Sequence, residues 1–86
     1  MRRSKLQVNV AILKTLAHNG RLNPTHITYH TYLNNKSVNE CLEFLMENNL
    51  VAEIERQTRK EYQITNLGIK ALSIANKIEK ALKSFN

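Results

Sequence analysis

The stretch LVAEIERQTRKEYQITNLG, residues 50–68, decides the fold of this chain. Apolar and polar residues alternate over residues 50–55 and again over 61–64, and this period of two predicts a pair of half-buried strands. A basic segment, residues 56–60, joins them, and because it lacks glycine we expect a loose turn rather than a two-residue one. Thr65 follows as the N-cap of a long amphipathic helix.

Three helical segments precede the hairpin, and each opens with a residue type that caps helix N-termini well. The expected helices span residues 5–18, 24–30 and 35–48, and their N-caps are Ser4, Asn23 and Asn34. Three helices, a two-stranded wing and a long last helix are the element order of a winged helix-turn-helix. We therefore predict an α+β, mostly helical fold, in which residues 1–64 form a winged helix-turn-helix DNA-binding domain and residues 65–86 a coiled-coil dimerisation helix.

Charged residues are unevenly distributed along the 86 residues of the chain. Thirteen Lys and Arg stand against seven acidic residues, which gives a net charge of +6. Residues 1–38 hold six of the basic residues and no acidic one. This balance suits a polyanionic partner, nucleic acid first and an anionic membrane surface second.

Other classes of protein lack support in the sequence. The single Cys41 cannot form an intramolecular disulfide, and no signal peptide or membrane-spanning run is visible, so we expect a cytoplasmic protein. The chain has no Asp and no Gly-rich phosphate loop, so we expect neither an enzyme nor a cofactor. His26 and His30 have the spacing of two metal ligands, but no third ligand accompanies them and no metal is predicted.

Polar and basic side chains concentrate on the elements that a winged helix-turn-helix presents to duplex DNA. The first turn of the third helix would read bases in the major groove, with Asn pairing to adenine and Lys reaching guanine or phosphate. The basic hairpin tip, the N-terminal arm and the amides that open the second helix would contact the backbone. The predicted DNA-binding residues are Arg2, Arg3, Lys5, Thr25, His26, Asn35, Lys36, Ser37, Asn39, Arg56, Arg59 and Lys60. The alternative is that these groups form only a solvated surface.

The last helix carries a seam of apolar residues with the 4-3-4-3-4 spacing of a coiled coil. Its members are Leu67, Ala71, Ile74, Ile78, Ala81 and Phe85. A helix of about 20 residues forms a rod of about 30 Å, and such a rod exposes its seam unless a partner covers it. We therefore predict a homodimer through this helix.

Short motifs along the whole chain resemble those of a known family. They are Arg2-Arg3-Ser4-Lys5-Leu6, Asn23-Pro24-Thr25-His26-Ile27, Leu33-Asn34, Cys41-Leu42-Glu43-Phe44-Leu45, Asn49-Leu50-Val51 and Tyr62-Gln63-Ile64-Thr65-Asn66-Leu67-Gly68. The chain resembles in these the small archaeal winged-helix DNA-binding proteins of the ten-kilodalton chromatin-associated type. The resemblance implies two DNA-binding heads joined by an antiparallel coiled coil, and a role as a transcriptional regulator or nucleoid-associated factor.

The chain departs from this family at two places. Glu40, Glu43 and Glu47 occupy the third helix, where Lys36 is the only basic residue, and the turn before it contains the bulky Thr31-Tyr32. The carboxylates would weaken binding where they lie near DNA phosphates. Both departures argue against sequence-independent coating of DNA, and they favour site-specific binding or another partner. A protein-interaction module and an RNA-binding protein are the alternatives.

Overall fold

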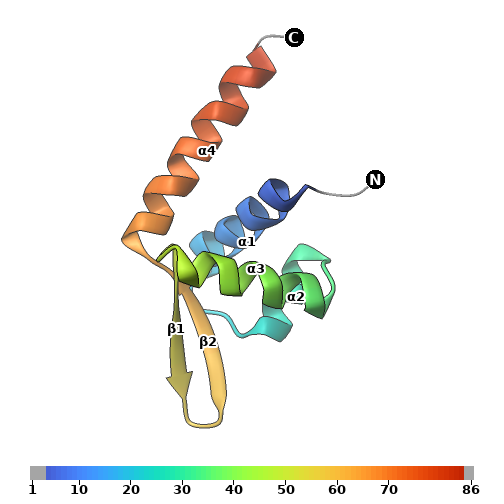
Figure 1. Cartoon of the computed structure of the whole chain (residues 1–86), viewed down its shortest axis with the longest axis vertical. Helices are drawn as coiled ribbons and strands as arrows, with labels where there is room; N and C mark the ends of the chain where they lie inside the picture. The colour runs from blue at the N-terminus through green and yellow to red at the C-terminus, as the bar shows by residue number, and fades with distance from the viewer. Residues whose placement is uncertain (1–3, 85–86) are drawn as a thin grey trace.

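The computed structural model describes residues 4–84, and its elements follow the predicted order (Figure 1). They are α1 (Lys5–Asn19), α2 (Pro24–Thr31), α3 (Asn35–Glu47), β1 (Val51–Arg56), β2 (Arg59–Ile64) and α4 (Asn66–Ser84). Helices α1 to α3 gather into a head, and the hairpin and α4 leave the same side of it in opposite directions. The predicted α+β, mostly helical winged helix-turn-helix fold is confirmed.

Local hydrogen bonds explain where the three helices of the head begin. The Ser4 hydroxyl accepts from the Gln7 amide at 3.1 Å while the Gln7 side chain accepts from the Ser4 amide at 2.8 Å, which is a capping box. Asn23 and Asn34 cap α2 and α3, and the side-chain oxygen of each accepts a hydrogen bond from the backbone amide three residues further on, at 2.8 Å. The predicted N-caps are therefore confirmed.

The hydrophobic core lies where the helices of the head meet one another and the hairpin. Its largest fully buried side chains are Ile12, Leu16, Ile27, Val38, Leu42 and Leu45. Val51, Tyr62 and Leu72 extend this core onto β1, β2 and α4. Burying each apolar side chain of this size stabilises the fold by about 1.5–3 kcal/mol, which makes this cluster the main support of so short a chain.

The tip of the hairpin differs from the prediction. Arg56 pairs with Arg59 as the last residues of the ladder, and only Gln57 and Thr58 join the strands, so the expectation of a loose turn is wrong. Gln57 takes a left-handed φ of 50° without being glycine, at a conformational cost of about 1–2 kcal/mol. Continued pairing of the strand ends offsets that cost, because each backbone hydrogen bond contributes about 1 kcal/mol.

A third extended segment, which the sequence did not reveal, is paired with the hairpin. Leu22 lies between α1 and α2, and its amide donates to the Tyr62 carbonyl at 3.1 Å while its carbonyl accepts from the Tyr62 amide at 2.7 Å. This bridge fixes β2 to the connection between the first two helices. Strand β2 is therefore paired on both of its edges, with β1 and with Leu22.

The base of the hairpin is closed by Thr65, which caps α4 as predicted. Its hydroxyl donates to the Asn49 carbonyl at 2.7 Å and accepts from the Gly68 amide at 3.0 Å. Its own amide donates to the Leu50 carbonyl at 3.1 Å. Gly68 lies so close to this carbonyl that a Cβ atom there would overlap it, and would also approach Ile64 Cγ1 to 2.7 Å. The direction in which α4 leaves the head is set by these contacts.

Helix α4 packs on the head through one side only. Leu72 is buried against the core, and Lys14 of α1 pairs with Glu79 at 3.6 Å. The helix then continues past α1 and gives the molecule a long dimension of 48 Å. No helix within residues 4–84 combines the length and hydropathy needed to span a bilayer.

Candidate nucleic-acid interface

A cleft between the wing and the start of α2 brings together four of the predicted DNA-binding residues. It has a volume of about 440 Å³ and is lined by Asn23, Pro24, Thr25, His26, Arg59 and Lys60. Thr25 and His26 are exposed in the first turn of α2, where helix amides carry a partial positive charge. The His26 amide already donates to the Asn23 side chain at 2.8 Å, so the expectation that it contacts phosphate is wrong, and the Thr25 amide is left for that contact. The wing adds two cations from the opposite side of the cleft.

The three cations of the wing differ in their partners. Lys60 forms an ion pair with Glu53 at 3.2 Å, and this hydrogen-bonded carboxylate raises the pKa of the Lys60 ammonium above its usual range. Arg56 lies 3.8 Å from the Glu61 carboxylate, an ion pair too long for a hydrogen bond. Within residues 4–84, Arg59 forms no ion pair, so its guanidinium is the most available of the three.

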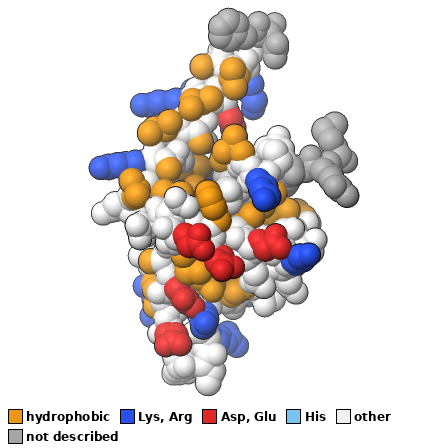
Figure 2. Space-filling view, in the orientation of Figure 1, with side chains coloured by type: hydrophobic (Ala, Val, Ile, Leu, Met, Phe, Trp, Pro, Cys, Tyr) orange, Lys and Arg blue, Asp and Glu red, His pale blue; other side chains and the backbone are white. Residues whose placement is uncertain are grey.

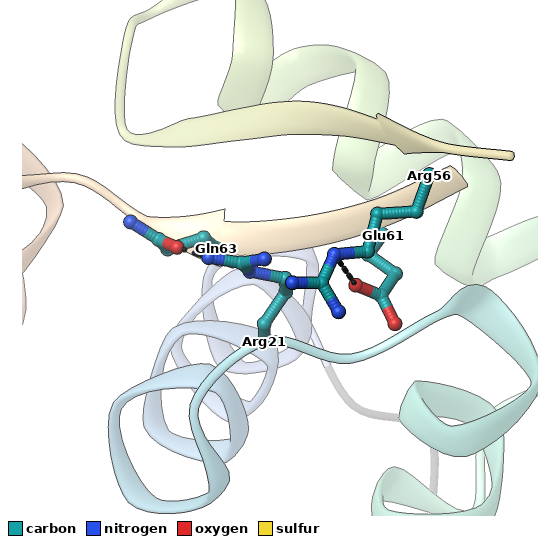
Figure 3. A network of polar contacts seen from close by, with 4 residues as sticks. All are labelled: Arg21, Arg56, Glu61 and Gln63. Carbon is teal, nitrogen blue, oxygen red and sulfur yellow. Dashed lines mark hydrogen bonds and ion pairs between the residues drawn. The ribbon is translucent and has the colours of Figure 1, made fainter. Parts of the chain in front are cut away.

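Arg21 adds a further cation to the wing (Figure 3), although it was not among the predicted site residues. It follows α1 in the chain, and its side chain reaches along β2 so that Nε donates to the Gln63 side chain at 3.4 Å. Figure 3 shows Arg56 folded over Glu61 on the same side of the hairpin. The sequence signal was weak because this placement depends on the bridge that pairs Leu22 with β2.

The predicted base-reading residues form the first turns of α3. Asn35, Lys36 and Asn39 are exposed, whereas Ser37 is half-buried. Asn35 is not fully free, since its side-chain oxygen accepts from the Thr28 hydroxyl of α2 at 3.2 Å. That bond connects the two helices of the helix-turn-helix beside the exposed end of α3.

The remaining outer face of α3 is acidic. Glu40, Glu43 and Glu47 recur at helical spacing and are exposed, and Glu53 and Glu55 extend the acidic surface onto β1. Figure 2 shows acidic side chains gathered on the face formed by α3 and β1. An approach of DNA along the whole of α3 would bring its phosphates toward them, so contact is favoured at the N-terminal end of α3.

Lys5 lies apart from the wing, in a groove between α1 and α3. This groove of about 400 Å³ is lined by Lys5, Val8, Asn9, Ser37, Glu40, Cys41 and Phe44. Burial, followed by the Glu40 carboxylate, raises the pKa of the Cys41 thiol, and the Lys5 ammonium opposes this with a smaller effect. Cys41 is therefore a protonated, half-buried side chain. The predicted contacts Arg2 and Arg3 lie outside the described residues.

The predicted seam of α4 is exposed along much of its length. Leu67, Ile74 and Ile78 are 51%, 58% and 54% exposed, Ala81 is exposed and Ala71 is half-buried. Figure 2 shows hydrophobic side chains running along α4, with lysines on both sides of them. Phe85, the last predicted member, lies outside the described residues.

Among residues 4–84 no group of three or more potential metal ligands occurs, and the His30 ring contacts the ring of Tyr29.

Comparison with known proteins agrees with this architecture. A sequence model of the family described as "Winged helix-turn-helix" matches residues 2–83, whereas no curated protein matches the chain. The YusO protein from Bacillus subtilis is similar with a TM-score of 0.83 at 18% identity, over 90% of this chain and 57% of that one. The transcriptional regulator BldR from Sulfolobus solfataricus gives 0.79 at 18% identity, over 87% and 55%.

A third similar structure is shorter. The Zalpha domain of Carassius auratus PKZ, solved in complex with Z-DNA, has a TM-score of 0.67 at 21% identity over 73% of this chain and 100% of that one. This chain spans only a little more than half of YusO and of BldR. At these identities the likeness shows the fold. The match of the family model over residues 2–83 shows that the chain belongs to the winged helix-turn-helix family.

Proposed function

We propose that the chain binds duplex DNA as a homodimer, acting as a transcriptional regulator or nucleoid-associated factor like the small archaeal proteins that it resembles. The cleft between the wing and α2 is the observation that carries this proposal. It combines the exposed first turn of α2 with Arg59 and Lys60, and a helix N-terminus facing cations is a suitable site for phosphate. Residues 1–38, which supply the α2 side of the cleft, contain no carboxylate side chain that would repel it, whereas on the wing side Lys60 is paired with Glu53.

The proposed mechanism is non-enzymatic and divides the work between elements. Backbone contacts by the wing and α2 position the head, and the side chains of Asn35, Lys36 and Asn39 then read base edges in the major groove. Lys5 and the N-terminal arm would add phosphate contacts. Since the rest of the outer face of α3 is acidic, we expect the helix to enter the groove by its N-terminal end.

A salt titration of binding to duplex DNA tests this proposal. Six phosphate contacts predict a slope of log affinity against log salt of about −5. Arg59→Ala removes one of them and should bring the slope to about −4. Lys77→Ala, on the exposed charged side of α4, is the matched control and should leave the slope unchanged. Absence of any complex at low salt, or equal effects of the two variants, would refute the proposal.

The proposed dimer uses residues 65–86, with Leu67, Ala71, Ile74, Ile78, Ala81 and Phe85 in the interface. Leu67, Ile74 and Ile78 are large apolar side chains that are about half exposed, and a second copy of the chain would cover them. A groove of about 540 Å³ between α1 and α4 continues the seam, and Leu6, Val10, Ala75, Ile78 and Leu82 are among its lining residues. The first turn of α1 would thus take part in the same interface.

Light scattering tests the dimer independently of DNA. The monomer has a mass of 10.0 kDa, so a dimer should give twice that value at micromolar concentration. Ile78→Asp places a carboxylate within the seam and should yield monomers. Asn76→Asp places the same group on the exposed charged side of α4, and should leave the dimer intact. A monomeric wild-type chain would refute the dimer and leave DNA binding as a separate question.

A protein-interaction module is the second candidate, and the acidic outer face of α3 favours it. Glu43→Gln and Glu47→Gln distinguish the two functions. If α3 approaches DNA, loss of a carboxylate should strengthen DNA binding, because it removes repulsion from phosphates. If the acidic face binds a protein, these variants should lose that partner without any change in affinity for DNA. Stronger competition by a folded RNA than by duplex DNA at equal salt would favour RNA binding.

A further inference from the structure

Two tyrosines on the helix-turn-helix are exposed far more than their size and chemistry would suggest. Tyr29 on α2 is 74% exposed and Tyr32, directly after α2, is 91% exposed, whereas the third tyrosine, Tyr62, is buried in the core. Thr25 and Tyr29 are four residues apart on α2, so they share one side of the helix, and Tyr32 follows directly after its end. The ring of Tyr29 therefore continues the surface that begins at the cleft beside Thr25.

The backbone of Tyr32 is unusual as well. This residue ends α2 in the left-handed conformation, with φ 58° and ψ 25°, and its amide donates to the Thr28 carbonyl at 2.9 Å. Glycine or asparagine adopts this conformation at little cost, whereas a bulky side chain does so under strain. Tyr32 thus places a large, solvent-exposed ring at a position where glycine would make the fold more stable.

The surroundings of the two tyrosines indicate the kind of partner. The Thr28 hydroxyl lies 3.2 Å from the side-chain oxygen of Asn35, which places this turn beside the residues predicted to enter the major groove. Residues 21–37 contain Arg21 and Lys36 but no acidic residue, so the segment that carries the two rings is neutral to basic. Figure 1 places this turn on the far side of the head from α4, the helix of the proposed dimer.

We propose that Tyr29 and Tyr32 bind the sugar-phosphate backbone of duplex DNA next to the site of entry of α3. The inference rests on the proposed DNA-binding function and extends its surface from the cleft along α2. Each phenol hydroxyl can donate to a phosphate oxygen, and each ring can pack on a deoxyribose without any added charge. The contact is with the backbone, so it contributes equally on specific and random DNA sequences.

Tyr32→Gly provides a test in which unfolding cannot mimic the expected result. Glycine relieves the left-handed backbone, so the melting temperature should stay the same or rise. Affinity for random-sequence duplex should fall roughly fivefold, as expected for the loss of a neutral hydrogen bond and its packing. Tyr29→Ala should have a similar effect. The salt slope should not change, because no charge is lost, whereas Arg59→Ala should reduce it by about 1.

Ile69→Ala is the matched control, since Ile69 is an exposed apolar residue of α4 outside the proposed interfaces. It should leave the affinity for DNA unchanged. The inference is overturned if Tyr32→Gly binds duplex as tightly as the wild type, or if the variant loses affinity for single strands alone. In either case the wild-type chain would still bind duplex and the proposed function would stand. A wild-type chain that fails to bind duplex would reject both.

Discussion

Replacing Gly68 by alanine tests the junction between the hairpin and α4. On an isolated helix this change stabilises by about 1 kcal/mol, because alanine is the better helix former. Here the added Cβ would overlap the Leu50 carbonyl oxygen and approach Ile64 Cγ1 to 2.7 Å, so the first turn of α4 must move. Overpacking of this kind costs about 1–3 kcal/mol. Movement would also break the 3.1 Å bond from the Thr65 amide to Leu50, for about 1 kcal/mol more.

The helix propensity and the broken bond offset each other, so the net loss in the free energy of unfolding should be roughly 1–3 kcal/mol. For a domain of this size, 2 kcal/mol corresponds to a fall in melting temperature of roughly 10 °C. Circular dichroism during heating measures it. Ser73→Ala, at an exposed position of the same helix, is the control and should stabilise slightly. If Gly68→Ala is as stable as the wild type or more so, the proposed close approach to Leu50 is wrong.

Three further predictions concern single side chains. Asn34→Ala removes the cap that accepts the Ser37 amide at 2.8 Å, and urea denaturation should show a loss of about 1 kcal/mol, whereas Asn34→Ser should retain most of the stability. Burial raises the pKa of the Tyr62 phenol above its ordinary value of 10.0, so the folded chain keeps a proton that the unfolded chain releases. The resulting stability is complete below pH 10.0 and is lost as the pH rises through the folded-state pKa; Tyr62→Phe should lack this alkaline loss. Burial also raises the pKa of the Cys41 thiol, so iodoacetamide should alkylate it more slowly in the folded chain than in urea, and equal rates would contradict this account.

The starts of the helices could be predicted because each depends on residues that are close in sequence. Ser4, Asn23, Asn34 and Thr65 all bond to an amide three residues further on, so the sequence alone carries the signal. The two-residue turn could not be predicted in this way. Gln57 has no intrinsic preference for a left-handed φ, and its conformation follows from the pairing of whole strands.

The candidate site shows the same division between local and distant effects. The sequence indicated a cationic tip, but which cation is paired depends on the register that brings Glu53 near Lys60 and Glu61 near Arg56. The contribution of Arg21 was hidden because it reaches the wing only through the pairing of Leu22 with Tyr62. The composition of the wing tip was enough to predict that it is cationic. Which of its cations are paired with a carboxylate depends on long-range backbone pairing.

The closure of the hairpin by Thr65 also bears on the order in which the chain folds. Its bond to Asn49 spans 16 residues, whereas the bond that attaches Arg21 to Gln63 spans 42. The entropy lost on closing a loop grows with loop length, so the shorter closure is less costly to form first. We expect the hairpin to be structured in the folding transition state, and the segment between α1 and α2 to join it afterwards.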